Sequence, residues 1–150
     1  MRVFERYSFF NMKQTQEEKD AVMAELDEII RRCNILGCKM IVVVPSKDMK
    51  ERGLTPTRKE IREDAVAVLK EMVKKCEPHG IRLSLEFCGE PSMTINRFED
   101  AYAIVEEVNS PLVGVTLDQY HFYAMVDGMM LPQAARPPRQ SFLDGPSTTF

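Results

Sequence analysis

The sequence predicts an α/β fold built on a parallel sheet. Apolar runs with strand character alternate along the chain with stretches in which apolar residues recur every three or four positions, as on one face of a helix. The order of these elements is strand, helix, strand, helix, strand, helix, strand. Short connections between such elements require right-handed crossovers, which leave the strands parallel and the helices outside the sheet.

The first strand and the first helix occupy the opening part of the chain. Residues 3–10 form an aromatic and β-branched run that favours a strand. Thr15 and Glu18 then have the spacing of a capping box, in which each side chain satisfies a backbone N–H group at a helix start. Gly37 supplies the left-handed residue that ends many helices. The apolar face between them consists of Val22, Leu26, Ile29, Ile30 and Cys33.

The second strand spans residues 40–44, where apolar residues follow one another without alternation. This pattern is typical of a parallel strand covered on both faces, and Pro45 ends the strand because proline cannot donate to a ladder. Thr55 and Pro56 predict the start of the next helix, through a capping hydroxyl and a proline that fits the first turn. The apolar face of this helix extends over residues 61–76.

The last two strands of the pattern enclose the third helix. Residues 81–87 form the third strand, and residues 113–117 form the fourth. Between them, Asn96 and Glu99 have the spacing of a capping residue and its partner, so we expect a helix to open there. The apolar face of that helix consists of Phe98, Ala101, Tyr102, Val105 and Val108.

Polar side chains stand where the third and fourth strands end. Glu86 closes the third strand, and Asp118 and His121 follow the fourth. Because the carboxyl ends of parallel strands share one edge of the sheet, we expect these side chains at the edge where α/β proteins place their chemistry. A carboxylate that ends an apolar strand is costly unless it is paired or binds a metal ion, so the pattern favours a divalent-metal site. Taken alone, either acid is equally well explained as a helix cap or loop residue, and His121 as a core histidine.

Periodicity alone does not separate an open doubly wound sheet from part of a (β/α)8 barrel. Two features favour the barrel. No glycine-rich phosphate-binding loop follows any predicted strand. The acids and the histidine lie at strand ends, as in barrel enzymes. Both features therefore favour a segment of a (β/α)8 barrel over an open sheet.

Composition excludes several classes of protein. With 150 residues and 44% hydrophobic content, the chain can bury one core. Its net charge of -3 provides no positive field for nucleic acid, and no run approaches the roughly 20 apolar residues of a transmembrane helix. The four cysteines lack C-x-x-C spacing, so we expect reduced, mostly buried thiols. We expect a cytoplasmic protein with a small-molecule substrate and with neither nucleic acid nor a membrane as partner.

Four segments of the second half of the chain resemble a known family. They are LEFCGEP at 85–91, TINRF at 94–98, AYAIV at 101–105 and LDQYHFYAM at 117–125. In order and spacing they are similar to the sugar isomerase/epimerase family with the xylose isomerase-like barrel, and most similar to its 2-keto-myo-inositol isomerase branch. The resemblance covers about residues 1–126.

The resemblance implies a (β/α)8 barrel with a single divalent ion, manganese, magnesium or zinc, bound by residues of strands five to eight. By motif match Glu86 is the first ligand and Asp118 the second. Glu86 and His121 are the implied catalytic residues, and His121 faces the substrate or a second metal position. Glu90 and Asn11 lie at strand mouths and are further candidates for substrate contact, although solvated loop positions explain them equally well. The implied reaction moves a proton of a sugar or keto-inositol through an enediolate, in carbohydrate or inositol catabolism.

The predicted strands correspond to strands three to six of that barrel, so its outer strands and two further ligands are missing from this chain. An open half barrel exposes strand edges and apolar helix faces, which favour self-association. Residues 127–150 predict an irregular, proline-rich tail, and we hypothesise that a frame error produced it. The prolines that interrupt any regular period there are Pro132, Pro137, Pro138 and Pro146.

Three alternatives to an isomerase stay open. A lyase of the inosose dehydratase type uses the same metal and proton abstraction but expels a hydroxyl group. An endonuclease of the same barrel needs more histidines than the two present, and the net negative charge disfavours it. The third alternative is a catalytically inactive fragment, because two of the implied ligands are missing.

Overall fold

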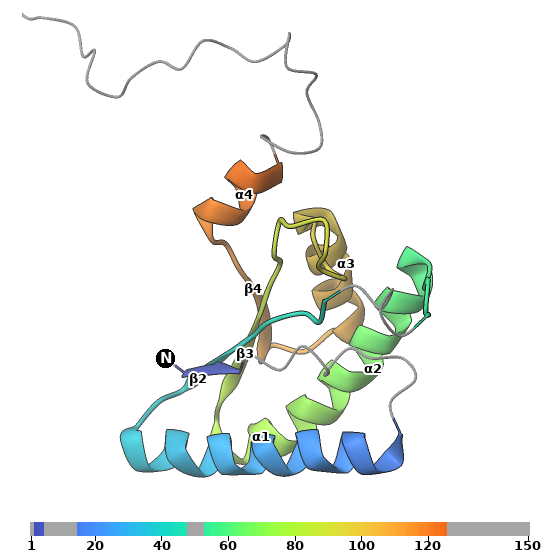
Figure 1. The fold of residues 1–150 in the computed structure, drawn as a ribbon. Coiled ribbons are helices and arrows are strands. Elements are labelled where there is room, and N and C mark those ends of the chain that lie inside the picture. The colour runs from blue at the N-terminus through green and yellow to red at the C-terminus, as the bar shows by residue number, and fades with distance from the viewer. Residues whose placement is uncertain (1, 5–14, 48–52, 126–150) are drawn as a thin grey trace, which may run out of the picture.

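The computed structural model describes residues 2–4, 15–47 and 53–125, which form a four-stranded parallel sheet and its connecting helices (Figure 1). The strands are β1 (Arg2–Phe4), β2 (Met40–Val43), β3 (Arg82–Glu86) and β4 (Val113–Thr116). They are hydrogen-bonded in the order β1-β2-β3-β4, so each strand lies beside the one that precedes it in the chain. The predicted alternation of strand and helix is confirmed.

Three long helices cover one face of this sheet. They are α1 (Gln16–Leu36), α2 (Arg58–Cys76) and α3 (Phe98–Val108), and a 3₁₀ turn (Glu77–His79) follows α2. α1 packs against α2, and α2 packs against α3. A short helix, α4 (Gln119–Met125), which the sequence did not predict, follows β4. Helices on a single face are the arrangement of a barrel wall, whereas a doubly wound sheet has helices on both faces.

The hydrophobic core lies between these helices and the sheet. The strands contribute alternate residues, and the helices contribute residues spaced three or four apart, as the two periodicities require. All four cysteines are unpaired, and three of them are buried, which confirms the prediction that most of the thiols are buried. The largest fully buried side chains are those of Leu26, Ile41, Leu69, Met72, Ile81, Leu83, Leu85, Phe87 and Ile95.

The first long helix has the ends that its sequence predicts. The Glu18 N–H group donates to Thr15 Oγ1 at 3.2 Å, and the Thr15 N–H group donates to Glu18 Oε2 at 2.9 Å, so the capping box is complete. Gly37 follows the last turn of α1 with a left-handed φ of 68°. Local sequence signals therefore determine both ends of α1.

The predicted start of α2 is wrong by two residues. Thr57 is the N-cap in place of Thr55, because Thr57 and Glu60 form a reciprocal capping box. The Thr57 N–H group donates to Glu60 Oε2 at 2.8 Å, and the Glu60 N–H group donates to Thr57 Oγ1 at 3.3 Å. The residue three positions after Thr55 is Arg58, whose side chain has no acceptor for the Thr55 N–H group and so cannot complete a capping box. Pro56 therefore precedes the cap and is not part of the first turn.

Two other predicted boundaries also need comment. Arg97 is the N-cap residue of α3 in place of Asn96, and it makes no side-chain capping bond. β1 covers residues 2–4, and the rest of the strand predicted to residue 10 lies outside the described residues. The predicted tail at 127–150 also lies outside them.

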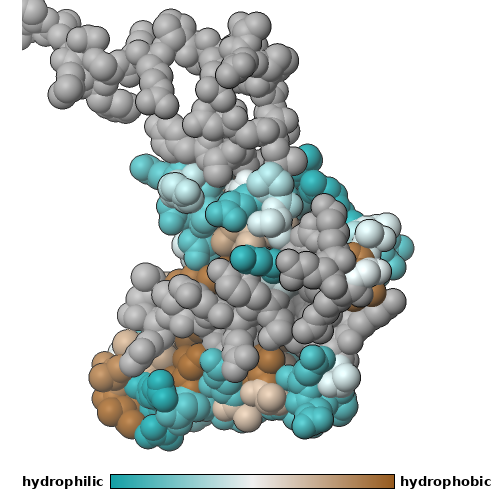
Figure 2. All heavy atoms as spheres, viewed as in Figure 1, coloured by the Kyte–Doolittle hydropathy of each residue, from teal (hydrophilic) through white to brown (hydrophobic). Residues whose placement is uncertain are grey.

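The surface near the C-terminal end of α1 is apolar (Figure 2). Ile35 and Leu36 are 69% and 58% exposed, and Met40 at the start of β2 is 38% exposed. These residues lie at the amino ends of the strands, away from the carboxyl ends where Glu86 and Asp118 lie.

In the described part of the chain, no helix combines the length and apolar character that a membrane span needs.

Candidate metal centre

The two strands that lead to the candidate site end side by side. Along β3 the side chains of Leu83 and Leu85 enter the core, so Ser84 and Glu86 lie on the opposite face of the sheet. The strand register pairs Glu86 with Thr116 of β4. Ser84 Oγ and Thr116 Oγ1 are 2.6 Å apart and share a hydrogen bond that links the two strands. This polar face therefore leads directly to the carboxyl edge of the sheet.

Asp118 lies between β4 and α4 and caps the helix. Its Oδ1 accepts a hydrogen bond from the Tyr120 N–H group at 2.8 Å, and its carbonyl oxygen accepts one from the His121 N–H group at 3.1 Å. This geometry resembles that of an N-cap aspartate, so the helix-cap explanation of this residue is correct. It does not exclude a second role, because a carboxylate has two oxygens and a cap uses one of them.

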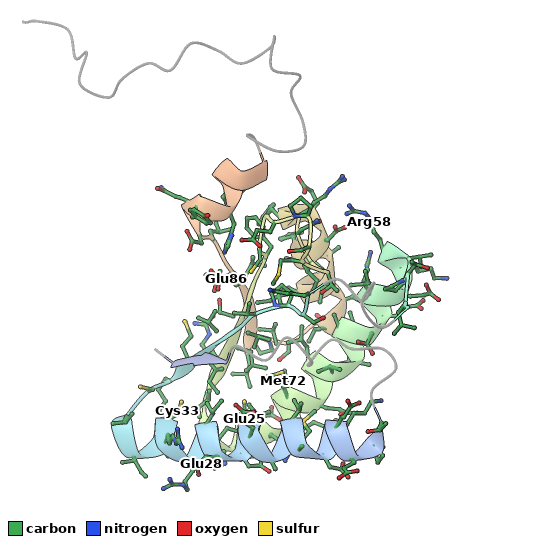
Figure 3. The ribbon with its side chains drawn as sticks, in the orientation of Figure 1. Glu25, Glu28, Cys33, Arg58, Met72 and Glu86 are labelled. Atoms are coloured by element: carbon green, nitrogen blue, oxygen red, sulfur yellow. The ribbon has the colours of Figure 1, made fainter. Side chains whose placement is uncertain are left out.

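Glu86, Asp118 and His121 converge at this edge of the sheet. One potential ligand atom from each residue lies within 4.8 Å of the others. His121 Nε2 is 3.7 Å from Glu86 Oε1, and the two side chains are only 15% and 16% exposed. Glu86 lies at the α4 end of β3, far from the α1 residues Cys33 and Glu28 (Figure 3).

The donor set of this cluster suits a divalent cation. Zinc ligands lie about 2.0–2.2 Å from the ion, so atoms within 4.8 Å of one another can meet at one ion after small side-chain movements. Two carboxylates and one imidazole provide the oxygen and nitrogen donors that such ions prefer. The Nδ1 atom of His121 is buried and has no hydrogen-bond partner within the described residues.

The electrostatic environment of the cluster is negative. Burial, followed by the negative charges of Glu86, Glu90 and Asp118, raises the pKa of the Cys88 thiol to about 12. Cys88 therefore stays protonated at neutral pH and is a poor nucleophile. The same carboxylates attract a cation to the carboxyl ends of β3 and β4.

The remaining candidates lie elsewhere. Glu90 is exposed in the loop after β3, where it accepts a hydrogen bond from Ser92 Oγ at 3.4 Å, and it is not part of the cluster. Asn11 lies outside the described residues. The second histidine, His79, is at the opposite end of the sheet, where its Nδ1 lies 2.9 Å from Asn34 Nδ2.

Sequence reasoning did not identify the residues that dock α4 beside the cluster. The Phe122 ring packs edge to face against Phe87, with 4.9 Å between centroids, and lies 6.2 Å from the ring of Phe98 on α3. The available signal was the aromatic character of the residues around His121. Phe122 holds α4, and with it His121, against the end of β3.

The chain matches one protein family over most of its length. Residues 2–143 match the family described as xylose isomerase-like TIM barrel. The chain is 38% identical over 117 residues to the inosose isomerase of Bacillus subtilis (strain 168), and 36% identical to that of Bacillus velezensis. Each match covers 78% of this chain and 40% of the relative, so the chain spans about two fifths of the curated relatives it matches.

Solved structures confirm the predicted partial barrel. The crystal structure of the IolI protein with a zinc atom has a TM-score of 0.72 and 34% identity, over 83% of this chain and 42% of that chain. A xylose isomerase-like TIM barrel protein from Mycobacterium smegmatis in complex with magnesium has a TM-score of 0.59 and 18% identity, over 80% and 40% of the two chains. The second similarity concerns the fold alone.

Proposed function

Because the chain belongs to the xylose isomerase-like TIM barrel family, we propose that it carries part of the active site of a metal-dependent isomerase or epimerase. The observation that carries this proposal is the convergence of Glu86, Asp118 and His121 within 4.8 Å at the carboxyl edge of the sheet. The similarity to inosose isomerases favours a keto-inositol, or a related sugar, as the substrate.

Glu86 and Asp118 are the proposed ligands of the ion. Manganese, magnesium and zinc all suit a site of carboxylates and imidazole. A bound divalent ion would supply Lewis acidity that polarises a substrate carbonyl and acidifies the adjacent C–H bond. Asp118 would serve the site twice, since one of its oxygens also holds the first turn of α4.

His121 is the proposed residue that orients the substrate or moves its proton between adjacent carbons. Imidazole can accept and donate a proton near neutral pH, which an isomerisation through an enediolate requires. Its ring is largely shielded from solvent and lies 3.7 Å from the Glu86 carboxylate. A proton accepted by the ring is therefore held beside a negative charge and away from bulk water.

Zinc titration of the 150-residue chain, in competition with a chromophoric chelator, tests the ligand assignment. We expect Glu86→Gln and Asp118→Asn each to weaken zinc binding by at least about tenfold, because each removes a charged donor. Glu90→Gln is the matched control, since it removes an exposed carboxylate from the loop after β3, outside the cluster. Equal zinc affinity in the wild type and in all three variants would contradict the assignment.

The reaction itself is tested with 2-keto-myo-inositol in deuterated water. Proton transfer between adjacent carbons incorporates solvent deuterium into the ring, which proton NMR detects as a loss of signal. Loss of water from the substrate would instead support a dehydratase. Zinc binding without either reaction would support an inactive fragment of the barrel.

A further inference from the structure

Gly89 makes a close backbone contact with α4. It is buried and lies three residues after Glu86. A Cβ atom on Gly89 would lie 2.1 Å from the carbonyl oxygen of His121, 3.0 Å from its carbonyl carbon and 3.3 Å from its Cα. All three atoms are backbone, so no side-chain rotation can make room for a methyl group.

The requirement at Gly89 is for space and not for an unusual backbone conformation. The described glycines with left-handed φ values are Gly37, Gly53 and Gly80. Ordinary van der Waals contact begins at 3.4 Å. A methyl group at Gly89 would therefore force the His121 backbone to move by roughly 1 Å.

Such a movement would reach the candidate metal centre. The His121 ring is 3.7 Å from Glu86 through Nε2, and its backbone N–H group donates to the Asp118 carbonyl oxygen. Displacement of the His121 backbone therefore changes the distances among Glu86, Asp118 and His121. Active-site groups lose function when they are displaced by about 1 Å.

We propose that Gly89 is a positioning residue, whose lack of a side chain lets the backbone of His121 lie against the loop after β3 and so places the His121 ring beside Glu86. The proposal rests on the proposed function only in assuming that the His121 ring, once placed, serves the metal site. The placement itself is a property of the metal-free chain. Gly89 acts through His121.

Gly114 provides a matched control. It lies on β4, the strand that leads to Asp118, and no atom of the described residues lies within 4 Å of the position that its Cβ would occupy. Like Gly89, it is not among the described glycines with left-handed φ. Gly114→Ala therefore adds the same methyl group near the same site without the collision.

Imidazole NMR of the 150-residue chain tests the proposal directly. The chain has two histidines, so His79, beside Asn34 at the other end of the sheet, is an internal reference. In metal-free protein, we expect nuclear Overhauser effects from the His121 ring to Glu86 in the wild type and in Gly114→Ala. In Gly89→Ala we expect the Overhauser effects from the His121 ring to Glu86 to fall by at least about half in intensity. The Overhauser effects between His79 and Asn34 should stay unchanged.

Titration with zinc alone provides the second readout. We expect zinc to shift the His121 ring signals in the wild type and in Gly114→Ala, and to shift them by less than about half as much in Gly89→Ala. Unchanged Overhauser effects of His121 in Gly89→Ala would overturn the proposal. So would loss of the helical circular dichroism signal in that variant, because the methyl group would then disrupt the whole fold and not the placement of α4. If the wild type bound no zinc, the proposed function would fail, and the metal-free comparison would still decide the role of Gly89.

Discussion

Ser84 and Thr116 join β3 to β4 through a side-chain hydrogen bond of 2.6 Å on the face of the sheet that carries Glu86. Thr116 is the direct cross-strand partner of Glu86, and Ser84 is paired with Gly114 two residues earlier. The bond therefore lies immediately before the point where the two strands present their carboxylates.

Removal of one hydroxyl from this pair should destabilise the fold. Thr116→Val keeps the shape of the side chain but leaves the partly buried Ser84 hydroxyl without its partner, so we expect a loss of about 0.5–1.5 kcal/mol in the free energy of unfolding. Ser84→Ala should cost a similar amount. The double variant should cost less than the sum of the two, because it leaves no unpaired hydroxyl. Urea denaturation measures all three, and additive losses would contradict the coupling.

The N-cap of α2 gives a second test. Thr57→Ala removes the hydroxyl that accepts from the Glu60 N–H group, and we expect it to lower the free energy of unfolding by about 1 kcal/mol. Thr55→Ala is the control two residues away, where the exposed threonine makes no cap, and its effect should stay within about 0.5 kcal/mol. Thermal or urea unfolding distinguishes the two. A larger loss at Thr55 would place the cap where the sequence alone predicted it.

The two threonines also show how far local sequence signals reach. Both stand before a helical pattern, and proline at position 56 made Thr55 the more attractive cap. The reciprocal hydrogen bonds with Glu60 make Thr57 the N-cap, and the capping-box spacing of Thr57 and Glu60 is present in the sequence. For α1 the same signal, read at Thr15, was correct. The error at α2 came from weighing a proline above a complete capping box.

Asp64 on α2 should make stability depend on pH in the direction opposite to most carboxylates. Burial raises the pKa of Asp64, and the positive charge of Lys19 offsets this only in part. Its Oδ2 is buried and has no hydrogen-bond partner within the described residues. Above the raised pKa the folded state therefore carries a poorly solvated charge. We expect Asp64→Asn to raise the free energy of unfolding at pH 7.

The sign of this effect follows from proton linkage. As the pH falls through the raised pKa toward the ordinary value of 3.8, the folded chain binds a proton before the unfolded chain does, and the wild type gains stability. The advantage of Asp64→Asn should therefore shrink as the pH falls from 7 to about 4. Glu63→Gln, at the exposed neighbouring position, is the control for removal of a carboxylate from this part of α2. Urea denaturation across this pH range measures both variants.

The aromatic docking of α4 gives a fourth test. Phe122→Ala removes the ring that packs at 4.9 Å against Phe87, an aromatic pair worth about 0.5–1.5 kcal/mol. We expect faster hydrogen exchange in a peptide covering residues 117–125 and unchanged exchange in α1 (Gln16–Leu36). Phe122→Leu should restore most of the protection, because it keeps an apolar side chain at that position. Equal acceleration in both segments, measured by mass spectrometry, would show a global effect instead.

The candidate site was predictable only in part. The convergence of Glu86 with Asp118 could be inferred from the sequence, because parallel strands end at one edge of a sheet. The helix that carries His121 could not, because its seven residues are too few for a periodic signal and their position depends on packing against Phe87. Gly89 follows a strand as an isolated glycine, and only coordinates reveal which backbone approaches it.

All three members of the cluster belong to one strand–helix–strand unit, β3–α3–β4, and the first turn of α4 that follows it. An ion bound there would close a loop within that unit, in the manner of a reversible crosslink. Unfolding of α4 would then release the ion, and release of the ion would favour unfolding of α4. By mass action the melting temperature of this part of the molecule would therefore rise with the concentration of free zinc. Residues before β3 would share in that gain only through their packing against the unit.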